Sequence, residues 1–282
     1  MMQGRLLPPE GGRIQCFPAA RWREEFPLAA TCGLDRIEWI VDHPDWEANP
    51  LMTVPGREEI TALSEKTGVR VRSACADLFM PTPLHSVDAA ERARREEWLA
   101  RIIGAAGTLG LEHVDVPFVD ASAIDGARAF DDVVGVFRRA GPRADDAGLA
   151  LCLETSLPPA RFRDLLEAVG HPRVRANHDI GNSASLGWPA AEEFAAIGRW
   201  VSCVHIKDRV RGGTTVPLGQ GAADFPAAFA ALQTCAYPGH FVMQIARGAA
   251  GDEAAWTKAN ALAARKMIST LAGEEASRGP RP

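Results

Sequence analysis

The chain has 282 residues, of which 46% are hydrophobic, and its formal net charge at pH 7 is −5. A chain of this length and composition can form one sizeable core and does not require a second domain. Its basic residues are mixed with acidic ones rather than gathered in a basic patch, which argues against a nucleic-acid-binding protein.

Cysteine usage and the hydrophobic runs indicate the compartment. Six cysteines occur without a CxxC pair, and several of them fall in apolar, strand-like runs. Buried free thiols of this kind are typical of a reducing compartment. The first residues, MMQGRLLPPEGG, lack the apolar core of a signal peptide, and no run reaches the length of a membrane-spanning helix. We therefore expect a soluble, cytoplasmic protein.

Short β-rich runs alternate with longer amphipathic runs along the whole chain, which predicts βα units and a parallel sheet. Helices that end at Gly33, Gly68 and Gly110 directly precede strands, because glycine favours the position that follows a helix. The expected strands are Met2–Leu6, Arg36–Val41, Val69–Ala74, His113–Val116, Leu149–Leu153, Val174–His178, Val201–Ile206 and Phe241–Ile245.

Eight strands with interleaved helices, and no GxGxxG turn after the first strand, favour a single (β/α)8 TIM barrel of the α/β class over an open doubly wound sheet. We expect the barrel to span residues 1–272 and its last helix to cover about Asp252–Leu271. Residues 273–282 lack apolar periodicity and are expected to form a flexible C-terminal tail. The proline-containing segment Asp42–Gly56 is expected to be a lid or rim loop.

Three successive apolar strands each end in a side chain that can bind a metal ion. Glu154, Asp179 and His205 are separated by 25 and 26 residues, close to the length of one strand and one helix. The C-terminal tips of parallel strands meet around one mouth of a barrel, so the three side chains should converge there. Gln244 holds the matching depth on the eighth strand. Each of these residues could also be an ordinary polar residue at a strand end, but four successive strands predict a metal site.

The donor set would consist of two carboxylates, one imidazole and one amide oxygen. Such a set suits Mn²⁺, Mg²⁺, Co²⁺ or Zn²⁺ without selecting among them. We therefore expect one divalent metal ion as the cofactor.

The motifs LET, HDIGN, HIKD and PLGQGAADF together resemble the xylose isomerase-like TIM barrel family, the sugar phosphate isomerase/epimerase group. The resemblance extends over nearly the whole chain. It implies a metal-dependent enzyme whose ion is held by Glu, Asp, His and Glu at the ends of strands 5 to 8. These positions map onto Glu154, Asp179, His205 and, with a change of residue, Gln244. The family also contains ketohexose 3-epimerases, inosose dehydratase and endonuclease IV.

The change at Gln244 affects the expected reaction, because an amide cannot accept a proton as a base. In the similar 3-epimerases two metal-bound glutamates act on opposite faces of the substrate. Here Glu154 alone could abstract a proton next to a metal-bound carbonyl, which predicts an isomerase or epimerase of a sugar or sugar phosphate. One alternative is a metal-dependent lyase or dehydratase that acts on a keto sugar or inosose. Another is a non-catalytic carbohydrate-binding barrel.

Further side chains are candidates for the mouth of the barrel. Lys207 lies two residues after His205 on the same face and is the second catalytic candidate. Glu38 resembles a substrate-contacting glutamate of the family, although a salt bridge inside the barrel is an equal expectation. Trp46, on the loop after the second strand, is expected to lie over a substrate. Arginines next to glycines after strands 7 and 8 are candidates for binding a phosphate or another part of the substrate: Arg209, Arg211 and Arg247.

Other polar residues are expected to support the fold. Asp208 should orient His205 or cap a loop, and His178 should face the helices. Asp77 and Arg5 are weaker candidates of the same structural kind. The expected partner is a small carbohydrate, with neither nucleic acid nor membrane, and assembly into a homo-oligomer is left open.

Overall fold

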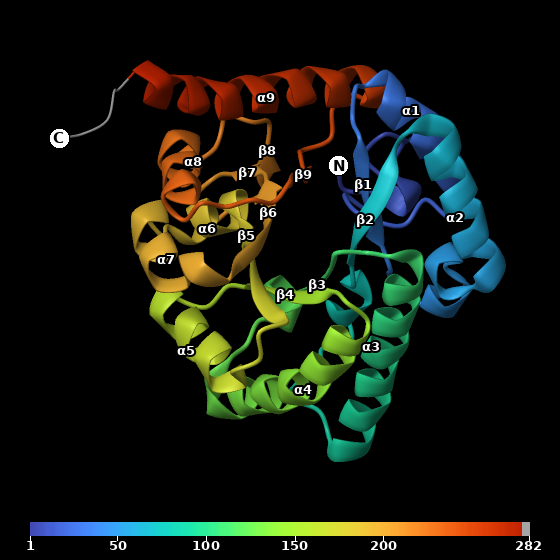
Figure 1. Cartoon of the computed structure of the whole chain (residues 1–282), viewed down its shortest axis with the longest axis vertical. Helices are drawn as coiled ribbons and strands as arrows, with labels where there is room; N and C mark the ends of the chain where they lie inside the picture. Colours follow the sequence, from blue (N-terminus) through green and yellow to red (C-terminus); the bar gives the residue numbers. More distant parts are fainter. Residues whose placement is uncertain (278–282) are drawn as a thin grey trace.

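The computed structural model describes residues 1–277 and shows a barrel of parallel strands surrounded by helices (Figure 1). The strands pair in the order β1-β2-β3-β4-β5-β6-β9, and every pair is parallel. Their bounds are β1 Arg36–Ile40, β2 Arg70–Cys75, β3 His113–Phe118, β4 Ala150–Thr155, β5 Val174–Asp179, β6 Val201–Ile206 and β9 Phe241–Met243. The predicted TIM barrel is therefore confirmed.

Helices follow the strands and form the outer ring (Figure 1). Their bounds are α1 Glu25–Thr31, α2 Val54–Thr67, α3 Ala89–Leu109, α4 Gly126–Asp146, α5 Pro159–Val169, α6 Ile180–Leu186, α7 Ala190–Ile197, α8 Phe225–Thr234 and α9 Glu253–Ser277. A small antiparallel pair, β7 (Asp208–Arg209) and β8 (Thr215–Val216), stands apart from the barrel. None of the helices in the described part of the chain combines the length and the hydrophobicity that crossing a membrane requires.

The N-terminal residues close the barrel between β1 and β9. Met2 forms a parallel bridge with Glu38, whose backbone N–H donates to the Met1 carbonyl over 2.8 Å. On the other side, the Met2 N–H donates to the Met243 carbonyl over 3.0 Å. The predicted first strand, Met2–Leu6, is thus reduced to one bridge. The chain turns away at Gly4, whose φ of +78° is outside the range of a strand.

Glycines end the helices as expected. Gly68 and Gly110 follow α2 and α3 with φ values of +74° and +75°, and both bond back to carbonyls of the last helical turn. Only glycine adopts this left-handed conformation without strain, so these two residues fix where each strand begins.

The segment from residue 42 to residue 56 packs against the barrel and is not a lid. It contains two short 3-10 turns, Trp46–Ala48 and Pro50–Met52, in which Trp46 and Leu51 are buried. Asn49 fixes the segment: its Oδ1 accepts from Trp39 Nε1 over 2.7 Å and its Nδ2 donates to the Ile40 carbonyl over 2.9 Å. Of the two expectations, the buried turns contradict a lid, whereas Asp42 and His43 line a cavity at the mouth of the barrel and so agree with a rim loop.

The last helix is longer than predicted. α9 continues to Ser277, past Leu271 and into the segment that was expected to be a tail. Residues 278–282 of that predicted tail lie outside the described residues.

Candidate active site

Glu154 is the penultimate residue of β4 and lies on the inner side of the barrel mouth, where its side chain is buried. Asn177 Nδ2 donates to its Oε2 over 3.3 Å, and Asn182 Nδ2 donates to its Oε1. Burial, together with the negative charge of Asp179, raises the pKa of Glu154 to about 7. A carboxyl with this pKa can both take up and release a proton near neutral pH, as a general base must.

Asp179 and His205 lie side by side at the ends of β5 and β6, because the register of these strands pairs the two residues. His205 Nδ1 is 3.9 Å from Asp179 Oδ2 and 3.8 Å from Glu154 Oε2. The three predicted ligands therefore converge, as their spacing along the chain implies. Asp179 Oδ1 accepts the Asn182 N–H over 2.8 Å and so caps α6, which fixes the carboxylate in place.

His205 Nδ1 lies close enough to Glu154 and to Asp179 to share an ion with each, and one set whose ligand atoms all lie within 4.8 Å of one another consists of Glu154, His205 and Asp115. Asp179 Oδ2 is buried and accepts no hydrogen bond within the described residues, although the Lys207 ammonium lies 3.4 Å away and offsets part of its charge. A bound cation would complete that compensation. Oxygen and nitrogen ligands bind Zn²⁺ or Mg²⁺ at about 2.0–2.2 Å, so two ligands of one ion lie within about 4 Å of each other. The separations of 3.8 and 3.9 Å meet this condition.

Glu38 lies beneath the site and forms an ion pair with the opposite nitrogen of His205. Its Oε1 is 2.9 Å from His205 Nε2, and neither side chain is exposed. Burial alone would raise the pKa of Glu38, but His205 and Ser73 lower it to about 2. Burial would likewise lower the pKa of His205, but Glu38 raises it to about 10. This pairing directs Nδ1 toward Glu154 and Asp179. Of the two expectations for Glu38, the structure favours the internal salt bridge over contact with a substrate.

Gln244 and Lys207 lie at the same mouth and contact each other. Lys207 Nζ donates to Gln244 Oε1 over 2.9 Å and is 3.4 Å from Asp179 Oδ2. Gln244 Nε2 donates to Gln15 Oε1 over 2.8 Å. The amide oxygen of Gln244 therefore accepts a hydrogen bond from Lys207. It could coordinate a metal ion only if that hydrogen bond were broken or shared.

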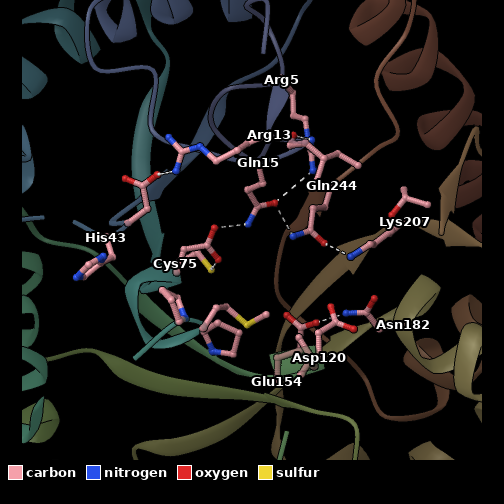
Figure 2. Close-up of a pocket in the computed structure, with 18 residues that line it drawn as sticks. Arg5, Arg13, Gln15, His43, Cys75, Asp120, Glu154, Asn182, Lys207 and Gln244 are labelled. Carbon is pink, nitrogen blue, oxygen red and sulfur yellow. Dashed lines mark hydrogen bonds and ion pairs between the residues drawn. The ribbon is translucent and has the colours of Figure 1, made fainter. Parts of the chain in front are cut away.

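A cavity of about 320 Å³ opens above these residues, and Glu154, Lys207 and Gln244 line it. Figure 2 shows Gln15 and Gln244 on one side of the pocket and Glu154 and Asn182 on the other. Of the five predicted substrate-binding residues, Glu38, Trp46, Arg209, Arg211 and Arg247, none lines this cavity in the described part of the chain.

Trp46 is buried away from the pocket. Its ring centroid is 5.7 Å from that of Trp98, and the Arg101 guanidinium lies 4.6 Å from the centroid of the Trp46 ring. The expectation that Trp46 covers a substrate is wrong, because the 3-10 turn that carries it packs toward α3 instead of over the mouth.

Two of the three arginines proposed for phosphate are engaged by other partners. Arg247 donates to the carbonyls of Gly4, Leu7 and Ile14, at 2.8–3.0 Å, and so ties down the N-terminal loop. This use of its donors corrects the substrate-binding prediction for Arg247. Arg209 donates to the Gly213 carbonyl of its own hairpin and to Asn182 Oδ1.

Arg211 lies against Gly187 and lines a separate cavity between α6, α7 and α8. It does not line the cavity at the mouth of the barrel. The predicted substrate role of Arg211 therefore has no support in the geometry. Arg209 is linked to Glu154 through Asn182, which accepts a hydrogen bond from Arg209 and donates one to Glu154.

Several residues of the site were missed by sequence reasoning. Asn177 lies two residues before Asp179 and so shares its inward-facing side of β5, and Asn182 is the last residue of the HDIGN motif. Their positions could therefore have been inferred from the sequence. Asp115 lies inside the barrel, close enough to Glu154 and His205 for one ion to touch all three. Burial, followed by the charge of Glu154, raises the pKa of Asp115 well above its ordinary value. The sequence feature that could have revealed Asp115 was its position on the inward-facing side of β3.

Asp208 and His178 have the structural roles that were expected. Asp208 accepts the backbone N–H groups of Gly219, Gly221 and Ala223 over 2.8–3.1 Å, which caps the loop after β8. His178 faces the helices, with its ring centroid 4.6 Å from that of Phe194.

The metal-free protein is expected to lose stability between about pH 7 and pH 10. Burial raises the pKa of Glu25 and of Glu193 to about 8, and Glu38 raises that of His205 to about 10. A raised pKa means that the folded state binds the extra proton, and this stabilisation disappears as pH rises through the folded value. The buried Met1 amine has a lowered pKa, so its contribution to stability increases as pH rises. It is one group acting against three.

Urea unfolding with a chelator at pH 7, 8.5 and 10 measures this loss, which should reach at least about 1–2 kcal/mol, since one pKa unit corresponds to about 1.4 kcal/mol. Glu193→Gln should give a shallower decline. A free energy of unfolding that rises over this range would contradict the assignment of these buried protons.

Comparison with known proteins gives the class. The model of the xylose isomerase-like TIM barrel family matches residues 26–266. The chain belongs to this family.

The chain is 30% identical over 275 residues to L-ribulose-5-phosphate 3-epimerase UlaE of Escherichia coli, covering 89% of this chain and 94% of the relative. Among solved structures, an L-ribulose 3-epimerase matches with a TM-score of 0.77 at 17% identity, over 100% of this chain and 97% of that one. A xylose isomerase-like TIM barrel protein from Mycobacterium smegmatis, in complex with magnesium, matches with a TM-score of 0.70 at 20% identity, over 96% of each chain. These similar structures establish the fold.

Proposed function

We propose that this protein is a divalent-metal-dependent isomerase or epimerase of a small sugar or sugar phosphate. The observation that carries the proposal is Glu154: it lines the cavity, its pKa is raised to about 7, and it adjoins Asp179 and His205. The epimerase activity of the Escherichia coli relative supports the same reaction type.

Glu154, Asp179 and His205 would hold the cation. When bound, the cation polarises a carbonyl of the substrate and makes the neighbouring C–H bond more acidic. Glu154 Oε1 or Oε2 then takes the proton from that carbon, and Asn177 and Asn182 keep the carboxylate aimed into the cavity. Lys207 Nζ, whose side chain is 13% exposed, can donate a hydrogen bond to a substrate oxygen when it turns from Gln244.

Gln244 also favours a second candidate, a lyase or dehydratase that acts on a keto sugar or inosose. Elimination needs one strong base, and Glu154 supplies it without a second carboxylate at position 244. The two reactions share the first proton transfer and differ in the second step, which is either loss of a leaving group or return of a proton.

Exchange with deuterium oxide tests both versions. The protein, loaded with Mn²⁺, Mg²⁺, Co²⁺ or Zn²⁺, is incubated in deuterium oxide with ketopentoses, ketohexoses and their phosphates, and the sugars are followed by NMR. Deuterium next to the carbonyl supports the proposal, and the product distinguishes an isomer or epimer from a dehydrated sugar. Absence of exchange with every sugar and ion would leave a carbohydrate-binding barrel without catalysis.

A further inference from the structure

Across the pocket from Glu154, position 244 holds an amide instead of a carboxylate. Another residue of the pocket lining supplies a carboxyl group near it. Gln244 cannot carry a proton, and its amide donates to Gln15 Oε1 over 2.8 Å. Gln15 in turn donates from Nε2 to Asp77 Oδ2 over 2.8 Å. Asp77 lines the same cavity as Glu154. The chain of contacts from Gln244 therefore ends on a carboxyl group that faces the pocket.

Asp77 begins the 3-10 turn Asp77–Phe79, two residues after the end of β2, whereas Glu154 is the penultimate residue of β4. The tip of β3 lies between them, because β2 and β4 both pair with β3. The two carboxyl groups thus line one cavity from separate strand ends.

The surroundings of Asp77 are those of a carboxyl group that can hold a proton. Its Oδ1 accepts from the Cys75 thiol over 3.4 Å, and within residues 1–277 it has no ion pair with a lysine, arginine or histidine. The charged groups that act on it are Asp42 and Arg5, with opposite signs. Burial raises the pKa of Asp77, and the bonds from Gln15 and Cys75 only partly offset that rise.

We propose that Asp77 is a second catalytic acid–base residue, which exchanges a proton with the carbon that Glu154 deprotonates. This inference rests on the proposed function of the site.

The step balances as a pair of proton transfers. Glu154 takes the proton from the carbon next to the carbonyl, and the C–H electron pair forms the carbon–carbon double bond of an enediolate. The Asp77 carboxylic acid then gives its proton to the same carbon from the other side, and the electron pair returns to form the new C–H bond. Glu154 ends protonated and Asp77 ionised, and the reverse reaction or exchange with water restores both.

The test compares inversion with exchange in metal-loaded Asp77→Asn in deuterium oxide. Inversion should fall by roughly 10²-fold or more, the usual contribution of a general acid or base. Deuterium should still enter the unchanged sugar, because Glu154 removes the proton and returns a deuteron to the same face. Retained exchange also shows that the variant is folded. If Asp77→Asn does not fold, Asp77→Ser serves the same comparison.

The matched control is Asp131→Asn, which removes an exposed carboxylate on α4, outside the lining of this cavity, and should keep both inversion and exchange. Inversion by Asp77→Asn at the wild-type rate overturns the proposal, as does an equal loss of inversion in Asp131→Asn. Absence of exchange in the metal-loaded wild type is a different result, because it contradicts the proposed function itself.

Discussion

Replacing Glu154 with glutamine is expected to lower kcat by roughly 10²- to 10⁴-fold, the range that general-base catalysis supplies. The amide keeps nearly the size of the carboxylate and an oxygen that can face an ion, but it cannot accept a proton. Conversion and deuterium exchange of the sugar that Glu154 deprotonates should both be lost, because Glu154 takes the proton in the first step of that reaction. Initial rates and NMR in deuterium oxide measure the two effects.

Glu193→Gln is the matched control for this variant. Glu193 is also a buried glutamate whose pKa is raised, to about 8, but it lies on α7 and accepts from Ser183 Oγ over 2.6 Å, outside the cavity of Glu154. Its replacement should leave kcat close to the wild-type value. Full activity in Glu154→Gln would remove Glu154 from the mechanism.

The alternation of strands and helices and the glycines at helix ends were sufficient to predict the barrel. Gly68 and Gly110 mark helix ends because their positive φ is a local requirement that the sequence displays directly. The length of the N-terminal strand was overestimated. Pairing with β1 and β9 decides how many of its residues form backbone hydrogen bonds, and Gly4 turns the chain away from both strands.

The convergence of Glu154, Asp179 and His205 was also predictable, because parallel strands place equivalent ends at one mouth. The sequence could not show which charged side chains form hydrogen bonds with backbone carbonyls that are far away along the chain. Arg247 looks like an anion ligand beside a glycine, yet its donors are taken by carbonyls of residues more than two hundred positions away. Trp46 was misplaced for a related reason, since its burial depends on the packing partners Trp98 and Arg101.

Replacing His205 with alanine is expected to reduce the affinity for a divalent cation by more than the roughly 10- to 100-fold that loss of an outer-shell partner costs. In the proposed site His205 would contribute the nitrogen ligand, since its Nδ1 faces both Glu154 and Asp179. In the wild type, an ion at 100 times its Kd should add about 2.7 kcal/mol to the free energy of unfolding. The variant should gain little at the same concentration.

His178→Ala is the control for loss of a buried histidine. His178 is on β5, next to Asp179 in the chain, but its ring packs on Phe194 and faces the helices. This variant should lose some stability and still respond to the ion.

Elemental analysis of the purified wild type beside His205→Ala tests the metal centre most directly. The structure predicts about one divalent ion per chain in the wild type and none in the variant, because a site of this kind depends on each of its ligands. A wild type that holds no ion, and whose melting temperature does not rise with added Mn²⁺, Co²⁺, Mg²⁺ or Zn²⁺, would contradict a metal-dependent reaction at this site.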